Sequence, residues 1–498
     1  MIIPLSLNIV VEFEFYKKGF FVIFSGKPAC ISQIYSSTGM IIYKLCILIS
    51  MIHLTYDRGT ILVYGNVRVP GSAWDSRAGA YRAPAYLYRD IKAYVESSDF
   101  SYRDDVLDLV PTPGLTMKTV LRDYQERAVQ AWDRAGSWGV VVLPTGSGKT
   151  HVAMKAISMV SPAIVIVPTL DLLAQWKERL DEEFGIDTGV YSGEEHRLGP
   201  VTVATYDTAY IRAPGLGNRF RLVVFDEVHH LPSPGYLSIA EMFACPARLG
   251  LTATYEREDG RHLELPRLVG GKVFERNVES MEGIHLAPFD LKRIYVKLTA
   301  GEEEQYLRDM EIYKNYLRDN NIILRTPRDF ERLVMRSGRD KGAREAILAR
   351  HRARATALNS SSKMEALADV LQKHSSPEDK IIIFTEHNDL VYRISKQFLI
   401  PFITYTTDKG ERSRNLSEFR AGNYKALVTS KVLDEGVDVP DANVGIILSG
   451  SGSKREFVQR LGRILRKKGD KKAILYEIVS GSTSEVDTSY RRHKAVER

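Results

Sequence analysis

The sequence predicts an α/β protein with two tandem parallel-sheet domains, a small N-terminal domain and a helical insert between the two sheets. Short β-branched runs alternate with helical stretches over residues 116–298, and the same alternation returns over 361–482. Residues 299–360 between them have helical patterning without strand-like runs. A chain of 498 residues, 44% hydrophobic and 26% charged, is long enough for about three globular domains.

Charge and cysteine content set broad limits on the function. The net charge of +7 is compatible with a polyanionic partner. The three cysteines, at positions 30, 46 and 245, are too few for a four-thiolate metal site and too far apart to suggest a disulfide framework. We therefore expect a protein of the reducing cytoplasm.

Residues 1–50 differ from the rest of the chain because they are rich in Ile, Phe and Tyr. Their apolar runs, at 20–24 and continuing from 40 to 54, are shorter than the ~20 residues that cross a membrane. Ordinary patterning begins at Met51, which suggests an atypical extension translated from a wrongly assigned start. A weak membrane anchor is the alternative, although we expect no membrane partner.

Residues 51–115 are predicted to form a small separate domain. Two short strands, Ile52–Tyr56 and Thr60–Tyr64, precede a helix at about 84–97, and Pro111–Gly114 has linker composition. Nine aromatic residues lie between Tyr56 and Tyr102. They form either the core of this domain or a surface that stacks on nucleic-acid bases, and both readings stay open.

The first parallel-sheet domain contains a candidate phosphate-binding loop at residues 143–150. A β-branched strand (139–142) precedes this loop and a helix (151–158) follows it, so backbone N–H groups and a helix N-terminus face one small volume. Within the loop Thr145, Gly146, Ser147 and Gly148 would surround an anion. Lys149 would reach its phosphates and Thr150 would ligate Mg²⁺. Leu143 replaces the usual first glycine, and an ordinary Gly/Ser turn is the alternative.

The strands of this domain, including the one before the loop, are predicted at 139–143, 163–167, 200–204, 221–226 and 247–251, with functional residues at their carboxyl ends. Asp226 would hold Mg²⁺ and Glu227 would orient and deprotonate a water molecule. A helix N-cap is the alternative for this acidic pair. Before the loop, Gln125 would contact an adenine edge. After the last strand, the Thr252 and Thr254 hydroxyls would sense the nucleotide. Together these residues predict a nucleoside triphosphatase.

Arginine recurs at helical spacing in the helical insert. Between residues 325 and 354 ten Lys/Arg face four Asp/Glu, and positions 328, 332, 336 and 339 would share one helix face. Such a helix face is either only exposed to solvent or binds the phosphates of a nucleic acid.

The second α/β domain is predicted to have strands at 380–384, 402–405, 425–430 and 444–448 but has no phosphate-binding loop of its own. We therefore expect it to close over a nucleotide held by the first domain. Gln459, Arg463 and Arg466 would lie on one helix face, from which an arginine can stabilise the γ-phosphate. The loop 434–438 would contact both the nucleotide and the bound partner strand. Residues 483–498 have the composition of a polar tail.

The order of these blocks resembles that of superfamily 2 helicases and translocases, which contain two RecA-like domains and tolerate a non-glycine residue at position 143. The matching blocks are LRDYQ, LPTGSGKT, VPT, DEVH, TAT, SKVLDEGVDVP and QRLGRILR. Within the superfamily the chain is similar to the XPB family, because Arg257, Glu258 and Asp259 match its RED motif. Residues 299–360 would be its thumb and 51–115 its damage-recognition domain. The lack of a four-cysteine cluster argues against the iron–sulfur XPD relatives.

This resemblance implies an ATP- and Mg²⁺-dependent 3′→5′ DNA helicase or double-strand translocase acting in nucleotide excision repair, with a nuclease as a possible partner protein. One alternative is an RNA helicase or a restriction-type translocase built on the same two RecA-like domains. Another is a DNA-binding protein that uses ATP only as a switch. As nucleotide-binding residues besides the loop, the resemblance implies Arg122, Gln125, His229, Gly436, Asp438 and Gln459. For DNA it implies Thr169, Thr205, Arg257, Glu258, Asp259, Arg328, Arg332, Arg336, Thr429 and Ser430.

Overall fold

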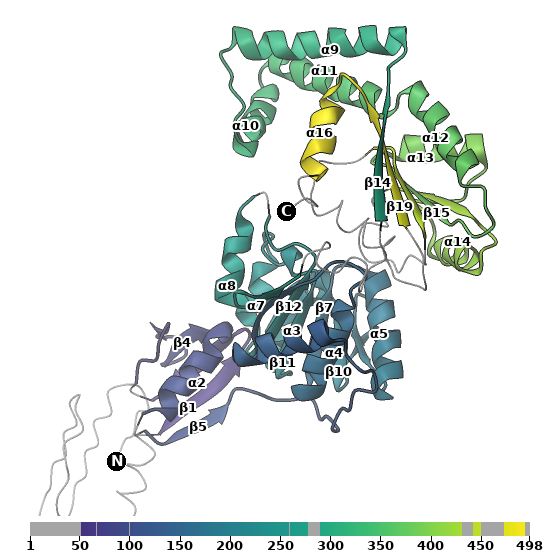
Figure 1. The fold of residues 1–498 in the computed structure, drawn as a ribbon. Helices are drawn as coiled ribbons and strands as arrows, with labels where there is room; N and C mark the ends of the chain where they lie inside the picture. The colour runs from purple at the N-terminus through teal and green to yellow at the C-terminus, as the bar shows by residue number, and fades with distance from the viewer. Residues whose placement is uncertain are drawn as a thin grey trace, which may run out of the picture.

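A computed structural model describes residues 51–493 apart from 66, 99, 258, 277–288, 431–441 and 450–472. Three sheets follow one another along this part of the chain (Figure 1). The small N-terminal sheet lies at one end, the first parallel sheet in the middle, and the second parallel sheet with the helical insert at the other end. The predicted extension at 1–50 lies outside the described residues. None of the described helices has the length and apolar character needed to cross a membrane.

The N-terminal domain is a five-stranded sheet of order β3-β4-β2-β1-β5, antiparallel except for the parallel pair β1–β5. Ile52, Leu54, Ile61 and Val63 are buried against the helix, as strand alternation requires. The two predicted strands are confirmed, and the predicted helix begins with a 3₁₀ turn. Its elements are β1 (Ile52–Asp57), β2 (Thr60–Tyr64), β3 (Ala73–Asp75), β4 (Ala80–Pro84), η1 (Ala85–Leu87), α2 (Tyr88–Glu96) and β5 (Tyr102–Asp105).

This small domain packs against the amino ends of the strands of the first parallel sheet. The Tyr56 hydroxyl donates to the carbonyl of Met242 (3.0 Å), and Arg89 donates to the carbonyl of Gly136 (2.8 Å) just before a strand. The backbone N–H of Val110 donates to the carbonyl of Arg219 (3.0 Å). The carboxyl ends of the strands, at the opposite edge of the sheet, are therefore left clear of this domain.

The first parallel sheet has the order β13-β6-β12-β11-β7-β10-β8-β9, parallel except for the final hairpin. All five predicted strands are confirmed to within one residue, and the helix predicted at 151–158 is confirmed but begins two residues earlier, at Lys149. The elements are α3 (Asp123–Arg134), β6 (Trp138–Val142), α4 (Lys149–Met159), β7 (Ala163–Val167), α5 (Leu170–Phe184), β8 (Gly189–Tyr191), β9 (His196–Arg197), β10 (Val201–Thr205), α6 (Tyr206–Leu216), β11 (Leu222–Asp226), η2 (Val228–His230), α7 (Leu237–Met242), β12 (Ala247–Thr252), η3 (Arg261–Glu264), α8 (Leu265–Leu268) and β13 (Lys272–Glu275).

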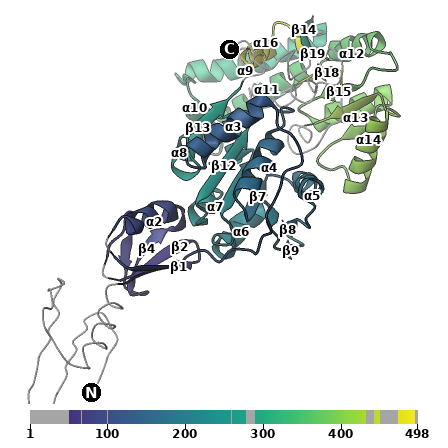
Figure 2. The same ribbon diagram turned by 60° about the horizontal axis from the view of Figure 1, so that its bottom comes forward.

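Helices cover both faces of this sheet, and alternate strand residues enter two separate cores. Val141 and Val165 pack with α3, α4 and α5, whereas Val140 and Ile164 pack with α6, α7 and α8. Figure 2 shows α3, α4 and α5 together on the near face. Because both faces are buried, the strands are continuous apolar runs, which is the pattern that made them recognisable in the sequence.

The second parallel sheet has the order β14-β19-β18-β15-β17-β16, with every described pair parallel. The four predicted strands are confirmed, but two more were missed. One of them, β14, pairs with β19, so the expected end of the first domain at residue 298 is wrong: this strand already belongs to the second sheet. The elements are β14 (Phe289–Val296), α12 (Ser361–Lys373), β15 (Ile381–Phe384), α13 (Asn388–Phe398), β16 (Phe402–Ile403), α14 (Lys409–Ala421), β17 (Ala426–Thr429), β18 (Val444–Ile447) and β19 (Ala473–Ser480).

The helical insert consists of α9 (Ala300–Asp319), α10 (Pro327–Ser337) and α11 (Lys341–Leu358). Small side chains of α11, among them Ala346, Ala349 and Ala353, are fully buried and let the helices approach closely. The expectation that Arg339 shares a helix face with the arginines before it is wrong, because α10 ends at Ser337. Gly338 and Arg339 form the turn that leads into α11.

The stretch predicted as a polar tail begins with a structural helix, α16 (Ser484–His493). Its Glu485 is buried and accepts a hydrogen bond from the equally buried Lys363 of α12 at 2.7 Å. Lys363 also donates to the carbonyl of Leu448 (2.6 Å), and Glu485 accepts from the backbone N–H of Ser480 (2.9 Å). The polar composition of this segment concealed a buried ion pair that joins the end of the chain to the second sheet.

We predict that Lys363→Met destabilises the second domain by about 3–5 kcal/mol, because it leaves the buried Glu485 carboxylate without its charged partner. Urea denaturation followed by circular dichroism would measure this loss. Lys177→Met is the matched control, since Lys177 pairs with Asp181 at the surface with about 30% of each side chain exposed. A loss no larger than that of the control would contradict the prediction.

Candidate nucleotide-binding and DNA-contact site

The parallel register of three strands brings the candidate catalytic residues together. Val142 of β6 is opposite Thr252 of β12, and Leu251 of β12 is opposite Asp226 of β11. The N–H of Leu143 donates to the carbonyl of Thr252 at 3.0 Å. The phosphate-binding loop, the acidic pair and the TAT segment therefore meet at the carboxyl edge of the sheet, as predicted.

The loop itself is held open by its glycines and by α3. Gly146 and Gly148 have φ values of +83° and +81°, which glycine adopts readily. The Ser147 hydroxyl turns inward to the carbonyl of Pro144 (2.6 Å). From α3, the Tyr124 hydroxyl donates to the carbonyl of Ser147 (2.5 Å). A Cβ on Gly148 would lie 2.5 Å from the Gln125 amide nitrogen, so a side chain at this position would have to displace Gln125.

Gln125 braces this loop. Its side-chain N–H donates to the carbonyls of Ser147 (2.9 Å) and Gly148 (3.3 Å), and its oxygen accepts from the N–H of Arg122. Contact with an adenine edge stays a prediction, because the amide is already committed to the loop here. Arg122 stands at the N-cap of α3 and donates to the Tyr124 hydroxyl at 3.4 Å.

Lys149 and Glu227 face each other across the site. The Lys149 ammonium lies 3.7 Å from a Glu227 carboxylate oxygen and 3.3 Å from the carbonyl of Leu143. Both side chains are nearly buried, with 10% and 12% exposed. Glu227 has φ +48° and ψ +54°, a left-handed conformation that is unusual for a non-glycine residue. Such strain often marks a functional residue, and here it turns the carboxylate back toward the phosphate-binding loop.

Asp226 is a buried carboxylate held by two N–H donors. One oxygen accepts from the indole of Trp176 (2.8 Å) and the other from the backbone N–H of Glu227 (3.0 Å). Burial, and then the nearby Glu227 carboxylate, raise the pKa of Asp226, whereas Lys149 and Trp176 oppose the shift. The site therefore contains two close carboxylates whose repulsion a cation would relieve.

Three further residues, which the sequence analysis did not select, border the site. Arg179 of α5 donates to the Thr150 hydroxyl at 3.3 Å. Burial, and then the Arg179 charge, lower the pKa of His151. Trp176 comes from the same helix as Arg179. No short motif marks these positions, and the apolar spacing of α5 would indicate only that Trp176 enters the core.

The donor set fits a magnesium–nucleotide. The buried hydroxyls of Thr145 in the loop and Thr254 after β12 have no hydrogen-bond partner within the described part of the chain. Buried hydroxyls are normally paired, so both are suited to ligand oxygens. Thr150 and Asp226 supply the hard oxygen ligands that Mg²⁺ prefers.

The DEVH segment is tied to the two segments that follow it. His229 is buried, and its Nδ1 lies 3.0 Å from the Thr252 hydroxyl. Arg257 donates to the carbonyl of His229 and grips the Asp259 carboxylate with two hydrogen bonds of 2.9 and 2.7 Å. Arg257 therefore links the DEVH segment directly to the segment that follows β12. The predicted DNA contacts of Arg257 and Asp259 stay predictions, and Glu258 lies outside the described residues.

The threonines predicted to contact DNA have two different positions. Thr169 and Thr205 are the N-caps of α5 and α6, where each accepts a hydrogen bond from a backbone N–H three residues ahead. Helix N-termini attract phosphate, which suits a backbone contact. Thr429, the last residue of β17, and Ser430 directly after it are buried, and the Thr429 hydroxyl donates to the carbonyl of Ser430 (2.9 Å). Their DNA contacts remain predictions.

The arginines of the insert are only partly committed to internal contacts. Arg336 bonds to Asp340 (2.9 Å) and Asn320 (2.7 Å), whereas the side chain of Arg332 is 77% exposed. Arg328 is exposed on the same helix.

Five predicted nucleotide-site residues of the second domain lie outside the described residues: Gly436, Asp438, Gln459, Arg463 and Arg466.

Family models match three consecutive parts of the chain. The Xeroderma pigmentosum group B helicase damage recognition domain matches residues 54–106, the res subunit of type III restriction enzymes matches 118–257, and the ERCC3/RAD25/XPB C-terminal helicase matches 345–496. The chain is 47% identical over 445 residues to the DNA 3′-5′ translocase XPB2 of Sulfurisphaera tokodaii, covering 89% of this chain and all of that protein. The chain belongs to the XPB family.

Other XPB relatives are more distant and longer. The putative DNA 3′-5′ helicase Rad25 of Haloarcula marismortui is 30% identical over 82% of this chain and 60% of its own length. The XPB/SSL2 subunit of general transcription and DNA repair factor IIH of Saccharomyces cerevisiae is 27% identical, over 80% of this chain and 46% of its own length. Among solved structures, the helicase domain of Pyrococcus furiosus Hef aligns with a TM-score of 0.48 at 18% identity, covering 74% of this chain and 97% of that one.

We predict that Gly148→Ala weakens ATP binding by this XPB-family protein at least tenfold, because the added Cβ would collide with Gln125 and His151 in the loop. Gly185→Ala is the matched control. Gly185 also has a positive φ, of +64°, but a Cβ there would meet nothing within 4 Å. Fluorescent-nucleotide titration would compare the two variants, and equal affinities would contradict the prediction.

Proposed function

We propose that this chain is an ATP-dependent 3′→5′ DNA helicase or double-strand translocase that opens duplex DNA in nucleotide excision repair. The observation that carries the proposal is the meeting of Lys149, Asp226 and Glu227 at one sheet edge of an XPB-family chain. The names of the relatives, which describe 3′-5′ DNA translocases and helicases, support the same activity.

In the proposed reaction the first domain holds the nucleotide. The ammonium of Lys149 binds the β- and γ-phosphates, while Thr150 and Asp226 hold Mg²⁺. When bound, this ion neutralises charge that develops on the phosphate oxygens. Glu227 orients the attacking water and accepts its proton. The Thr145 hydroxyl and the loop N–H groups bind phosphate oxygens and so position the nucleotide.

The second domain would complete the site from the other side. We propose that Arg463 and Arg466 reach the γ-phosphate when the two domains close, with Gln459, Gly436 and Asp438 beside the nucleotide. One contact between the domains is an ion pair of 2.6 Å between Asp171 of α5 and Arg412 of α14. Cycles of closing and reopening around ATP would then move the domains stepwise along a DNA strand.

DNA contact in this proposal depends on phosphates rather than bases. Thr169, Thr205, Thr429 and Ser430 would bind the strand between the domains, and Arg257 with Arg328, Arg332 and Arg336 would engage the duplex. Binding would then be largely independent of sequence and sensitive to salt. A nuclease partner, a cytoplasmic location and damage sensing by residues 51–115 belong to the same proposal.

We predict that Lys149→Ala abolishes ATP turnover, because the γ-phosphate loses its charged partner, while DNA affinity stays within about threefold of the parent. A coupled ATPase assay and DNA-binding anisotropy would measure the two effects. Lys155→Ala, on the same helix but farther from the loop, is the matched control. Hydrolysis by Lys149→Ala at the parent rate would refute the loop assignment.

The ATPase rate with duplex, forked and single-stranded DNA, compared with RNA, tests the nucleic-acid preference. We expect DNA to stimulate hydrolysis and RNA to stimulate it much less. Stimulation mainly by RNA would favour the RNA-helicase alternative. Stimulation by duplex DNA without any strand displacement would indicate a double-strand translocase, of the proposed or of the restriction type, rather than a helicase. ATP binding that changes DNA affinity without turnover would favour a simple switch.

A further inference from the structure

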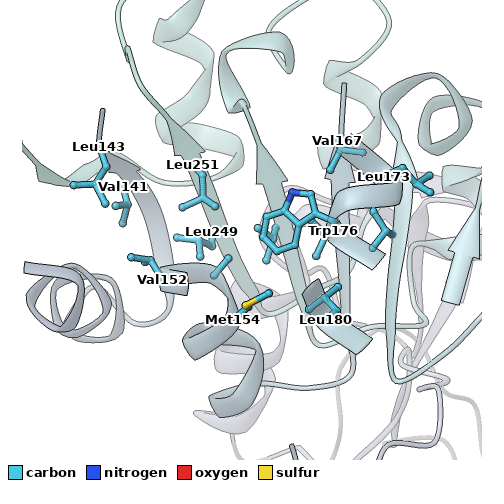
Figure 3. Close-up of a cluster of buried hydrophobic side chains, with 14 of the residues drawn as sticks. Val141, Leu143, Val152, Met154, Val167, Leu173, Trp176, Leu180, Leu249 and Leu251 are labelled. Carbon is cyan, nitrogen blue, oxygen red and sulfur yellow. The ribbon is translucent and has the colours of Figure 1, made fainter. Parts of the chain in front are cut away.

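The indole of Trp176 has an unusual hydrogen-bond partner. The side chain is 2% exposed and projects from α5 into the core of the first domain, among Leu173, Leu180 and Leu249 (Figure 3). A buried indole N–H needs an acceptor, and a backbone carbonyl commonly serves. Trp132 of α3 follows that pattern, since it donates to the carbonyl of Arg248 at 2.8 Å. Trp176 instead donates to the Asp226 carboxylate, also at 2.8 Å.

This bond fixes the orientation of the carboxylate. Each Asp226 oxygen accepts one N–H, from Trp176 on one side and from the Glu227 backbone on the other. A carboxylate has about four lone-pair positions, so two donors leave lone pairs free while removing rotation about the side-chain bond. Hydrogen bonds to a charged group in a buried setting are also stronger than those in water.

The helix that carries Trp176 is itself held in place. At its N-terminus Thr169 caps the helix, and Asp171 forms the ion pair with Arg412 of the second domain. One turn beyond Trp176, Arg179 donates to the Thr150 hydroxyl. The same helix thus contacts both proposed magnesium ligands, Thr150 through Arg179 and Asp226 through Trp176. Packing alone does not require this arrangement, since a phenylalanine would place a ring in the core without the donor.

We propose that Trp176 is a positioning residue for the magnesium site, and that its indole N–H holds Asp226 in the orientation that binds the ion. The inference rests on the proposed function, in which Asp226 is a metal ligand. Magnesium demands nearly ideal octahedral geometry, so a freely rotating carboxylate binds it poorly. Groups that orient metal ligands typically change metal affinity by about 10–100-fold when they are lost.

The test is Trp176→Phe in the full chain, with Trp132→Phe as the matched control. Both substitutions keep a ring in the same core and delete one indole N–H bond of 2.8 Å. The main measurement is the affinity for a fluorescent ADP analogue, first in EDTA and then over a magnesium series. The ratio of the two affinities within one variant does not depend on how much of the protein is folded.

For Trp176→Phe we expect an affinity in EDTA within about twofold of the parent and a half-saturating magnesium concentration raised about tenfold or more. The ATPase rate should recover in part at high magnesium. For Trp132→Phe we expect the parent magnesium dependence. A parent-like magnesium dependence in Trp176→Phe, or an equal shift in both variants, would overturn the proposal, because packing would then account for the residue.

Asp226→Ala separates a failure of this inference from a failure of the proposed function. If Asp226→Ala itself leaves the magnesium dependence unchanged, the metal-site assignment is wrong. If it shifts the dependence while Trp176→Phe does not, only the role of Trp176 is wrong. If both assignments are right, adding Trp176→Phe to Asp226→Ala should cause no further change in the magnesium dependence, since the indole acts through the carboxylate.

Discussion

The parallel pairing of β6, β12 and β11 is the constraint on which the rest of the candidate site depends. Its register places the end of β6 beside Thr252 and the end of β12 beside Asp226. Both faces of the sheet are packed with helices, so a slip of one residue would exchange the buried side chains between two differently shaped cores. The hydrophobic cores therefore determine where the loop lysine and the acidic pair meet.

That meeting costs stability locally. Asp226 and Glu227 bring two carboxylates into a region of low exposure, and Glu227 adopts a left-handed backbone conformation. The surrounding structure offsets these costs with specific donors: the indole of Trp176, the ammonium of Lys149 and the backbone N–H of Glu227. A site held in this way is already arranged for a bound cation and phosphate, which is the usual basis of electrostatic catalysis.

Contacts beyond the sheet connect this site to the rest of the molecule. The helix α5 touches the metal-ligand candidates near its middle and the second domain near its start, through Asp171 and Arg412. The His229 carbonyl accepts a hydrogen bond from Arg257 of the RED motif. The insert is joined to the second sheet by the paired hydrogen bonds between Arg354 and Glu386 (3.0 and 2.7 Å) and through Glu302, which accepts from Ser361. The N-terminal domain, docked at the opposite edge, leaves the site open.

The sequence by itself determined the two α/β domains, the loop at 143–150, the acidic pair and their common edge, because buried parallel strands and their polar ends leave a strong local pattern. Only the tertiary structure decided that β14 joins the second sheet, that Glu485 is a buried partner of Lys363 and that Gln125 braces the loop. The same holds for Trp176, whose apolar spacing indicates burial but not its acceptor. These features depend on contacts between residues 22 to 184 positions apart, and a local pattern carries no information about such contacts.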